Sequence, residues 1–154
     1  VTTATAVIGG MKLADAACAD GDCTNEALAV KNQVMDSWCN LQHAQSYGVR
    51  SYNELKTLTI GTDYQVHHLV ERRFELTLGE SFGAPGSWPS IVVSKVEHQI
   101  ITNVWRSAIG YSNSLNPLNT KSAQYYSLIE LIPDIYKNYP ILIDASMNFL
   151  QHLR

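Results

Sequence analysis

A strand that passes directly into a helix is the feature that most constrains the fold of this chain. The β-branched run Ile91-Val92-Val93 predicts a short strand, and Ser94-Lys95-Val96-Glu97 follows it at once with the spacing of a helix capping box. Gly110 is a suitable helix stop, so we expect the helix to run to about Ile109. His98 then lies within the first turn or so of that helix.

A partner strand is predicted upstream, at Tyr64 to Val70, and it contains the adjacent pair His67-His68. Residues 71–78 are expected to form a short helix. Residues 79–90 hold three glycines and two prolines, a composition that favours a loop. The predicted order is therefore strand, loop, strand and helix, which brings the histidine pair near His98.

The rest of the chain has mainly helical signals, from apolar periodicity, caps and stops. The predicted spans are Thr24 or Asn25 to about Gln45, Ser51 to Thr59 with a second capping box at Ser51-Tyr52-Asn53-Glu54, Lys121 to Lys137 with Pro133 as a kink or split, and Pro140 to about Leu153. We therefore predict an α+β, mostly helical fold with one small β-hairpin.

Length and composition favour a single globular domain. The chain has 154 residues, 45% of them hydrophobic and 16% charged, and no apolar run approaches the ~20 residues of a membrane span, so no membrane insertion is expected. The net charge of -3 gives no overall basic footprint, which counts mildly against nucleic acid as a partner, although local patches matter more. Residues 1–23 are interpreted as a variable leader and 24–154 as the functional domain. The first residue, Val1, suggests a piece cut from a longer polypeptide.

The cysteines give little support for a structural metal site. Cys18, Cys23 and Cys39 form no CxxC pair, so a structural zinc site is not expected. A Cys18–Cys23 disulfide and unpaired thiols both remain open.

The histidine pair is the strongest candidate for chemistry. Adjacent imidazoles can divide two tasks, one binding a metal while the other moves protons. Regular strand alternation would point His67 and His68 to opposite faces, so the strand must end or twist there for both to serve one site. Alternatively, the histidine pair is solvated or structural and has no catalytic role. Arg72 and Arg73 could likewise form an ordinary solvated face. Three roles are open for Glu71: a metal ligand, a group that orients an imidazole, or the ion-pair partner of an arginine.

Three segments together resemble a known nuclease family. They are His67-His68-Leu69-Val70-Glu71 with Arg73-Phe74, then Trp88 to Val93, then Glu97-His98-Gln99 with Thr102 to Arg106. This pattern is similar to the HNH/endonuclease VII superfamily, specifically to the double-histidine nuclease toxin domains at the C-termini of bacterial polymorphic toxins such as Rhs-type proteins. The resemblance covers about residues 51–139 and implies a ββα-metal core at about 64–109, surrounded by helices.

The resemblance also implies roles for individual residues. His67 and His98 would bind one divalent ion, either Zn, Mg, Mn or Ni, and His68 would be the general base. Many members carry another helix ligand one turn after the helix histidine, where this chain has Thr102; Asn103 would either replace it as an oxygen ligand or only brace the site. Phosphate contacts would come from Arg72, Arg73 and Arg106. Glu71 would contact and orient a metal ligand without binding the metal itself.

The function that follows from the resemblance is a metal-dependent endonuclease, here predicted to be a DNase of low sequence specificity. It would act as the antibacterial effector domain of a larger secreted or delivered toxin, in the cytoplasm of the target cell. A cognate immunity protein would block it in the producing cell, and the free domain would be a monomer. Two alternatives are an RNase on the same scaffold and a non-catalytic zinc-binding interaction domain.

Overall fold

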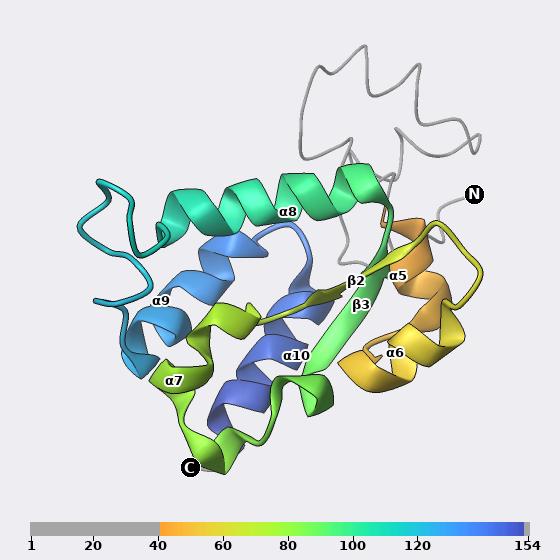
Figure 1. Cartoon of the computed structure of the whole chain (residues 1–154), viewed down its shortest axis with the longest axis horizontal. Coiled ribbons are helices and arrows are strands. Elements are labelled where there is room, and N and C mark those ends of the chain that lie inside the picture. Colours follow the sequence, from red (N-terminus) through yellow and green to blue (C-terminus); the bar gives the residue numbers. More distant parts are fainter. Residues whose placement is uncertain (1–40, 153–154) are drawn as a thin grey trace.

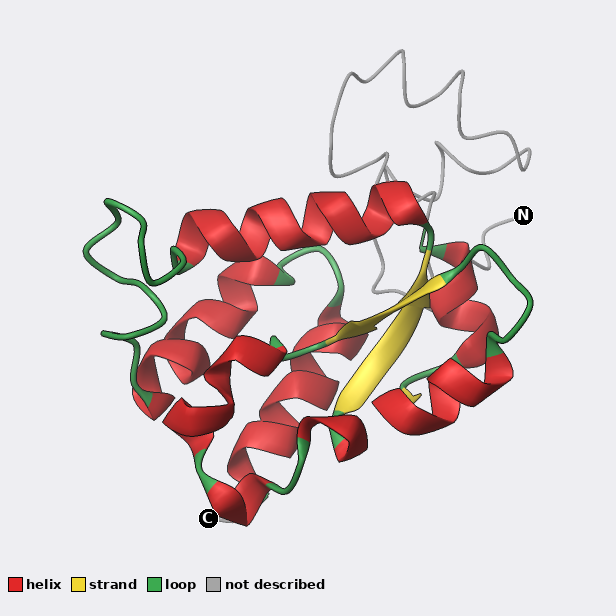
Figure 2. Ribbon diagram, viewed as in Figure 1, coloured by secondary structure: helices red, strands yellow, loops and turns green. Residues whose placement is uncertain are grey.

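The computed structural model describes residues 41–152. The predicted leader, the three cysteines and most of the helix predicted from Thr24 to Gln45 therefore lie outside the described residues. Within the described part the chain is mostly helical, with one small antiparallel sheet (Figures 1 and 2). This confirms the predicted α+β, mostly helical class. None of the helices in residues 41–152 is long and apolar enough to cross a membrane.

The sheet has three strands in the order β1-β3-β2, so β2 is an edge strand. β2 (Gln65–His68) pairs antiparallel with β3 (Pro89–Val93), which confirms the predicted hairpin, and His67 lies opposite Ile91. The predicted strand was too long, because β2 ends at His68 and the next two residues enter the core. The third strand, β1 (Arg50–Ser51), was not predicted, since two residues are too few to give an alternating pattern.

The strand-to-helix junction forms as predicted. α8 (Lys95–Ala108) begins directly after β3, and the Ser94 hydroxyl accepts a hydrogen bond from the Glu97 backbone N–H at 3.1 Å. The Glu97 carboxylate accepts in return from the Ser94 backbone N–H, which completes the capping box. Trp105 on the inner face of α8 is fully buried and donates from its indole nitrogen to the Tyr136 hydroxyl at 3.1 Å.

Within the described part of the chain, two helices precede the hairpin. α5 (Gln42–Tyr47) ends at Gly48, and α6 (Tyr52–Leu58) is capped by the Ser51 hydroxyl, which accepts from the Glu54 backbone N–H at 3.2 Å. Only half of the predicted capping box forms, because the Glu54 carboxylate forms an ion pair with Arg50 instead of returning to Ser51.

The segment between the strands is a series of short turns. The helix predicted at residues 71–78 divides into a 3-10 turn, η1 (Arg72–Phe74), and α7 (Glu75–Leu78). The predicted loop then contains two further 3-10 turns, η2 (Glu80–Phe82) and η3 (Pro85–Ser87). η3 returns the chain to β3 beside the end of β2.

The C-terminal helices are α9 (Tyr125–Ile135) and α10 (Pro140–Gln151). The predicted start at Lys121 was wrong, because the Asn119 side-chain oxygen accepts from the Lys121 backbone N–H at 2.9 Å and holds a turn there. Pro133 does not split the helix, since it lies in the last turn of α9, where little helix remains to be disturbed.

The two faces of the sheet border different apolar clusters. Val66 and Val92 pack with Leu55 of α6 on one face, whereas Ile91 and Val93 join the larger core formed with α8, α9 and α10 on the other. Figure 1 shows α5 and α6 beside the β2–β3 pair on one side and α9 and α10 on the other. The open edge of β2 lies between these two layers.

Candidate functional site at the edge of the sheet

A cavity of about 320 Å³ opens at the free edge of β2. It is lined by Tyr52, Val66, His67, His68, Glu71, Arg72, His98, Thr102 and Tyr111. The structure therefore brings the histidine pair and the helix histidine to one place, as the predicted strand–loop–strand–helix order required.

The edge position of β2 explains how two consecutive histidines reach one cavity. His67 lies opposite Ile91, on the face that contacts the larger core, and His68 lies opposite Ser90, on the face of Val66 and α6. The pair does alternate, as a regular strand requires. Because no strand of residues 41–152 pairs with the outer edge of β2, and because β2 ends at His68, both imidazoles border the same opening.

His67 and His98 form the candidate metal site. The residue His67 is 3% exposed, and its ring nitrogen Nε2 is buried without a hydrogen-bond partner among the described residues. The ring centre of His98 lies 5.1 Å away, at an interplanar angle of 77°. An ion held about 2.1 Å from one nitrogen of each ring in tetrahedral coordination would separate the ring centres by roughly 5 Å. The orphaned nitrogen and the spacing fit a shared divalent ion.

Burial keeps both of these imidazoles neutral, the form that binds metal. Desolvation by burial, together with the nearby His98 and His68, lowers the pKa of His67 to about 3. Burial also lowers the pKa of His98. Within residues 41–152, no group of three or more His, Cys, Asp or Glu side chains is arranged to hold an ion. Among the described residues the candidate site therefore offers two imidazoles, and other oxygen or nitrogen ligands would complete the coordination of an ion.

His68 is held by the loop that follows it. Its Nε2 lies 2.9 Å from the carbonyl oxygen of Pro85 in η3. A carbonyl oxygen can only accept, so Nε2 carries the proton and the neutral ring has its lone pair on Nδ1. Burial lowers the pKa of His68, the Pro85 carbonyl raises it and the positive charge of Arg72 lowers it. The result is an imidazole that is neutral near pH 7 and can accept a proton at Nδ1.

The two adjacent arginines are in different situations. Arg72 is exposed, lines the cavity and has no carboxylate partner among the described residues. The guanidinium of Arg73 instead donates to Glu71 at 2.7 Å, and to the three acceptors that follow: the carbonyl oxygens of Ile109 at 2.7 Å and Gly110 at 2.8 Å, and the Thr120 hydroxyl at 2.7 Å. The donors of Arg73 are thus used within the fold, which argues against the phosphate contact predicted for it.

Glu71 lies at the back of the cavity in an ion pair with Arg73, and its side chain is 13% exposed. Burial raises the pKa of Glu71, while the hydrogen bond and charge of Arg73 lower it. The sequence left three roles open for Glu71, and the structure shows one of them, the ion pair with an arginine.

Arg106 lies at the entrance of the cavity, next to Tyr111. Its guanidinium lies 4.8 Å from the ring centre of Tyr111, and it donates to the Tyr111 hydroxyl at 3.3 Å. Tyr111 lines the cavity but Arg106 does not, so a phosphate contact by Arg106 would occur only at the entrance.

Asn103 does not reach the cavity. It is exposed, and its side-chain oxygen accepts from Gln99 at 3.0 Å on the outer face of α8. Thr102 lines the cavity instead, because it follows His98 by four residues and so shares its helix face. Asn103, predicted either as an oxygen ligand or as a brace for the site, therefore lies outside the cavity lining.

Sequence reasoning missed Tyr52 and Tyr111 as cavity residues. Tyr111 follows a helix stop, and nothing in the local sequence distinguishes it from an ordinary loop residue. Tyr52 lies in a recognised capping box, which marks the start of a helix but does not indicate what the helix contacts.

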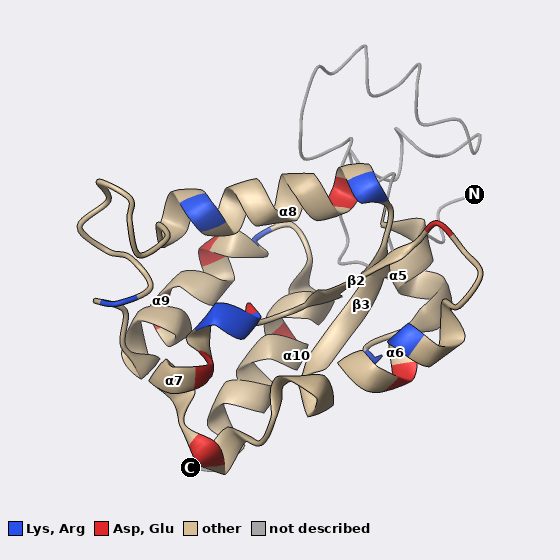
Figure 3. Ribbon diagram, viewed as in Figure 1, with Lys and Arg blue, Asp and Glu red and all other residues tan. Residues whose placement is uncertain are grey.

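The positive charge near the cavity comes from only a few residues of the described part of the chain. In Figure 3 the segment between β2 and α7, which carries Arg72 and Arg73, is blue and adjoins the end of β2. Other basic residues are scattered over the fold, in keeping with the net charge of -3. Positive charge at the cavity therefore comes mainly from Arg72, with Arg106 at the rim.

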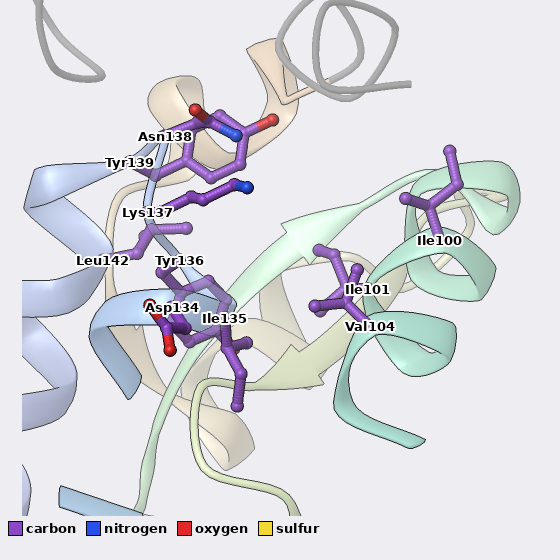
Figure 4. Close-up of a pocket in the computed structure, with 10 residues that line it drawn as sticks. All are labelled: Ile100, Ile101, Val104, Asp134, Ile135, Tyr136, Lys137, Asn138, Tyr139 and Leu142. Atoms are coloured by element: carbon purple, nitrogen blue, oxygen red, sulfur yellow. The ribbon is translucent and has the colours of Figure 1, made fainter. Parts of the chain in front are cut away.

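A second cavity, of about 250 Å³, lies away from the histidines (Figure 4). Ile101 and Val104 of α8 line one side, and the connection from α9 to α10 lines the other. Its lining is largely apolar and contains none of the histidines. We therefore place the candidate chemistry at the sheet edge.

Comparisons of the chain with protein families, curated proteins and solved structures found no match.

Proposed function

We propose that this chain is a metal-dependent endonuclease that hydrolyses phosphodiester bonds in DNA with low sequence specificity. The observation that carries the proposal is the position of His68: its Nε2–H is held by the Pro85 carbonyl, and it lines the same cavity as the orphaned imidazole of His67. A proton acceptor and a candidate ion site thus border one opening. The resemblance of the motif to double-histidine nucleases supports the same reading.

His67 and His98 would hold one divalent ion. Such an ion would withdraw charge from the scissile phosphate and stabilise the leaving oxygen. Burial favours the neutral form of both imidazoles, so no proton competes for their lone pairs near pH 7.

The other cavity residues supply the base and the positioning. Nδ1 of His68 would take a proton from the attacking water, and the Pro85 carbonyl would stabilise the imidazolium that forms. Arg72 would contact a phosphate oxygen, because its guanidinium is exposed at the cavity and carries no competing ion pair among residues 41–152. Contacts of this kind read the backbone and not the bases, so low specificity is expected.

The wider role is proposed from the family resemblance alone. The domain would be the effector part of a larger secreted or delivered toxin, acting in the cytoplasm of a target bacterium. A small immunity protein would cover the cavity in the producing cell, and the free domain would be a monomer.

The deciding experiment compares the wild type with His68→Ala and with His152→Ala, an exposed histidine at the end of α10. Purified proteins are incubated with plasmid DNA and separately with RNA, in Mg²⁺, Mn²⁺, Zn²⁺ or Ni²⁺ and in EDTA. We expect DNA cleavage by the wild type and His152→Ala, a loss of at least about 100-fold in His68→Ala, and no cleavage in EDTA. Cleavage of RNA but not of DNA would identify the enzyme as an RNase on the same scaffold and not as a DNase. No cleavage of either with any of the four ions would reject the nuclease.

A further inference from the structure

The cavity contains a parallel pair of rings that the proposed chemistry does not yet use. Tyr52 lies at the first position of α6, and its ring centre is 4.3 Å from that of His68, with an interplanar angle of 6°. Both residues line the cavity. A face-to-face contact of this kind covers one side of the imidazole and restricts rotation of its plane.

Three neighbours restrict the position of the His68 ring. The Pro85 carbonyl accepts from Nε2 and so holds one edge of the ring. The stacked ring of Tyr52 restricts tilting of the ring plane, and the edge-on ring of Trp88, 6.2 Å away, limits movement from another side. Together they determine where Nδ1 points.

The position of Tyr52 is itself well determined. Its backbone N–H donates to the carbonyl oxygen of Trp88 at 3.0 Å, and the Ser51 hydroxyl caps the helix that it begins. The next residue, Asn53, lies directly against Gly86 of η3, where an added Cβ would come within 2.6 Å of its side chain. The start of α6 is therefore packed against the turn that supplies the Pro85 carbonyl.

We propose that Tyr52 is a positioning residue for His68: its ring holds the imidazole in the plane that directs Nδ1 into the cavity. The inference rests on the proposed function, because it assigns Tyr52 a part in that reaction. The effect comes from the ring face, so the Tyr52 hydroxyl is not required. Removing the ring should leave substrate binding in place and slow the proton transfer.

The test measures kcat and KM for cleavage of a short fluorescent DNA oligonucleotide, in the divalent ion that supports the wild type. Tyr52→Phe keeps the ring, and we expect both constants within about twofold of the wild type. Tyr52→Leu removes it, and we expect kcat to fall by at least about tenfold with KM changed less than about threefold. Tyr64→Leu is the matched control, since Tyr64 packs on the same small apolar cluster but does not line the cavity.

A double-mutant cycle separates positioning from a general loss of structure. If Tyr52 acts through His68, Tyr52→Leu should cause no further loss when introduced into His68→Ala. Thermal unfolding in EDTA confirms that each variant folds, and Tyr52→Met replaces Tyr52→Leu if the latter does not.

The outcomes distinguish the inference from the function on which it rests. A wild type that cleaves, with Tyr52→Leu fully active, would overturn the role of Tyr52 alone. Equal losses in Tyr52→Phe and Tyr52→Leu would also overturn it, in favour of a contact by the hydroxyl. Additive losses in the double variant would show that Tyr52 acts independently of His68. A wild type that cleaves no nucleic acid would instead remove the proposed function.

Discussion

The guanidinium of Arg73 donates to the carbonyl oxygen of Gly110 at 2.8 Å, and this contact joins the turn η1, which follows β2, to the chain just after α8. The same side chain donates to Ile109 and Thr120, and it lies 4.9 Å from the ring centre of Tyr111. The turn after β2 and the end of α8 are thereby held together beside the cavity. Arg72, the preceding residue, is exposed at the cavity and free of such bonds among the described residues.

Substitutions of the two arginines should therefore have different effects. One should lower the stability of the fold and the other should weaken substrate binding. Arg73→Ala should lower the free energy of unfolding by about 3 kcal/mol, because it removes the donor to the Ile109 carbonyl and leaves the Glu71 carboxylate without its partner. Arg72→Ala should leave stability within about 0.5 kcal/mol and raise KM for DNA by roughly tenfold. Urea unfolding and steady-state cleavage measure the two effects. Arg72→Ala with unchanged KM would remove this residue from the phosphate site.

A second matched pair tests which face of α8 contributes to the site. Thr102 lines the cavity one turn after His98, whereas Asn103 is bonded to Gln99 outside it. Thr102→Val keeps the shape but removes the hydroxyl, and we expect kcat/KM to fall by roughly tenfold. Asn103→Ala should change it by less than about twofold. The reverse order would restore Asn103 as the oxygen ligand.

Metal binding should be visible without any activity. An ion that binds only the folded protein, at 100 times its dissociation constant, adds about 2.7 kcal/mol to the free energy of unfolding and so raises Tm by several degrees. We expect this rise in the wild type and in His152→Ala, and its loss in His67→Phe and His98→Ala. EDTA should reverse it. An equal rise in all four proteins would place the ion elsewhere.

The metal-free protein should lose stability in acid because of His67. In the folded protein the pKa of His67 is about 3, whereas in the unfolded chain it is near 6.5, so the unfolded state binds the proton first as pH falls. The free energy of unfolding in EDTA should therefore decrease below about pH 6.5, with about 2–3 kcal/mol of loss at pH 4.5 from this residue. His67→Phe should show a smaller decrease over the same range. Parallel curves for the two proteins, measured by urea unfolding at each pH, would contradict this assignment.

Local signals in the sequence were sufficient for much of the site's framework. The capping box at Ser94 and Glu97 forms as predicted, because both of its hydrogen bonds join residues three apart and need no distant partner. The hairpin and the placement of His98 at the start of α8 follow from patterns of equally short range. The adjacent histidines could thus be assigned to a common site before any tertiary contact was known.

Other expectations changed where another residue, near or distant in the sequence, competes for a side chain. Arg73 looked equivalent to Arg72 in the sequence, but its partners at Ile109, Gly110 and Thr120 are 36 to 47 residues away. Glu54 completes a capping box by its spacing, yet it pairs with Arg50. In each case the competing interaction is electrostatic and depends on geometry that the local pattern does not contain.

The sequence by itself determined that a strand bearing His67-His68 returns through a second strand into a capped helix bearing His98. Only the tertiary structure decided how the adjacent histidines share a cavity. They point to opposite faces, as strand alternation demands, and they meet because β2 is the edge strand and ends at His68. Strand order depends on β1 pairing with the far side of β3, and a pairing of two residues leaves no periodic signal in the sequence. The stacked ring of Tyr52 on His68 is decided in the same way, by packing between segments that are distant along the chain.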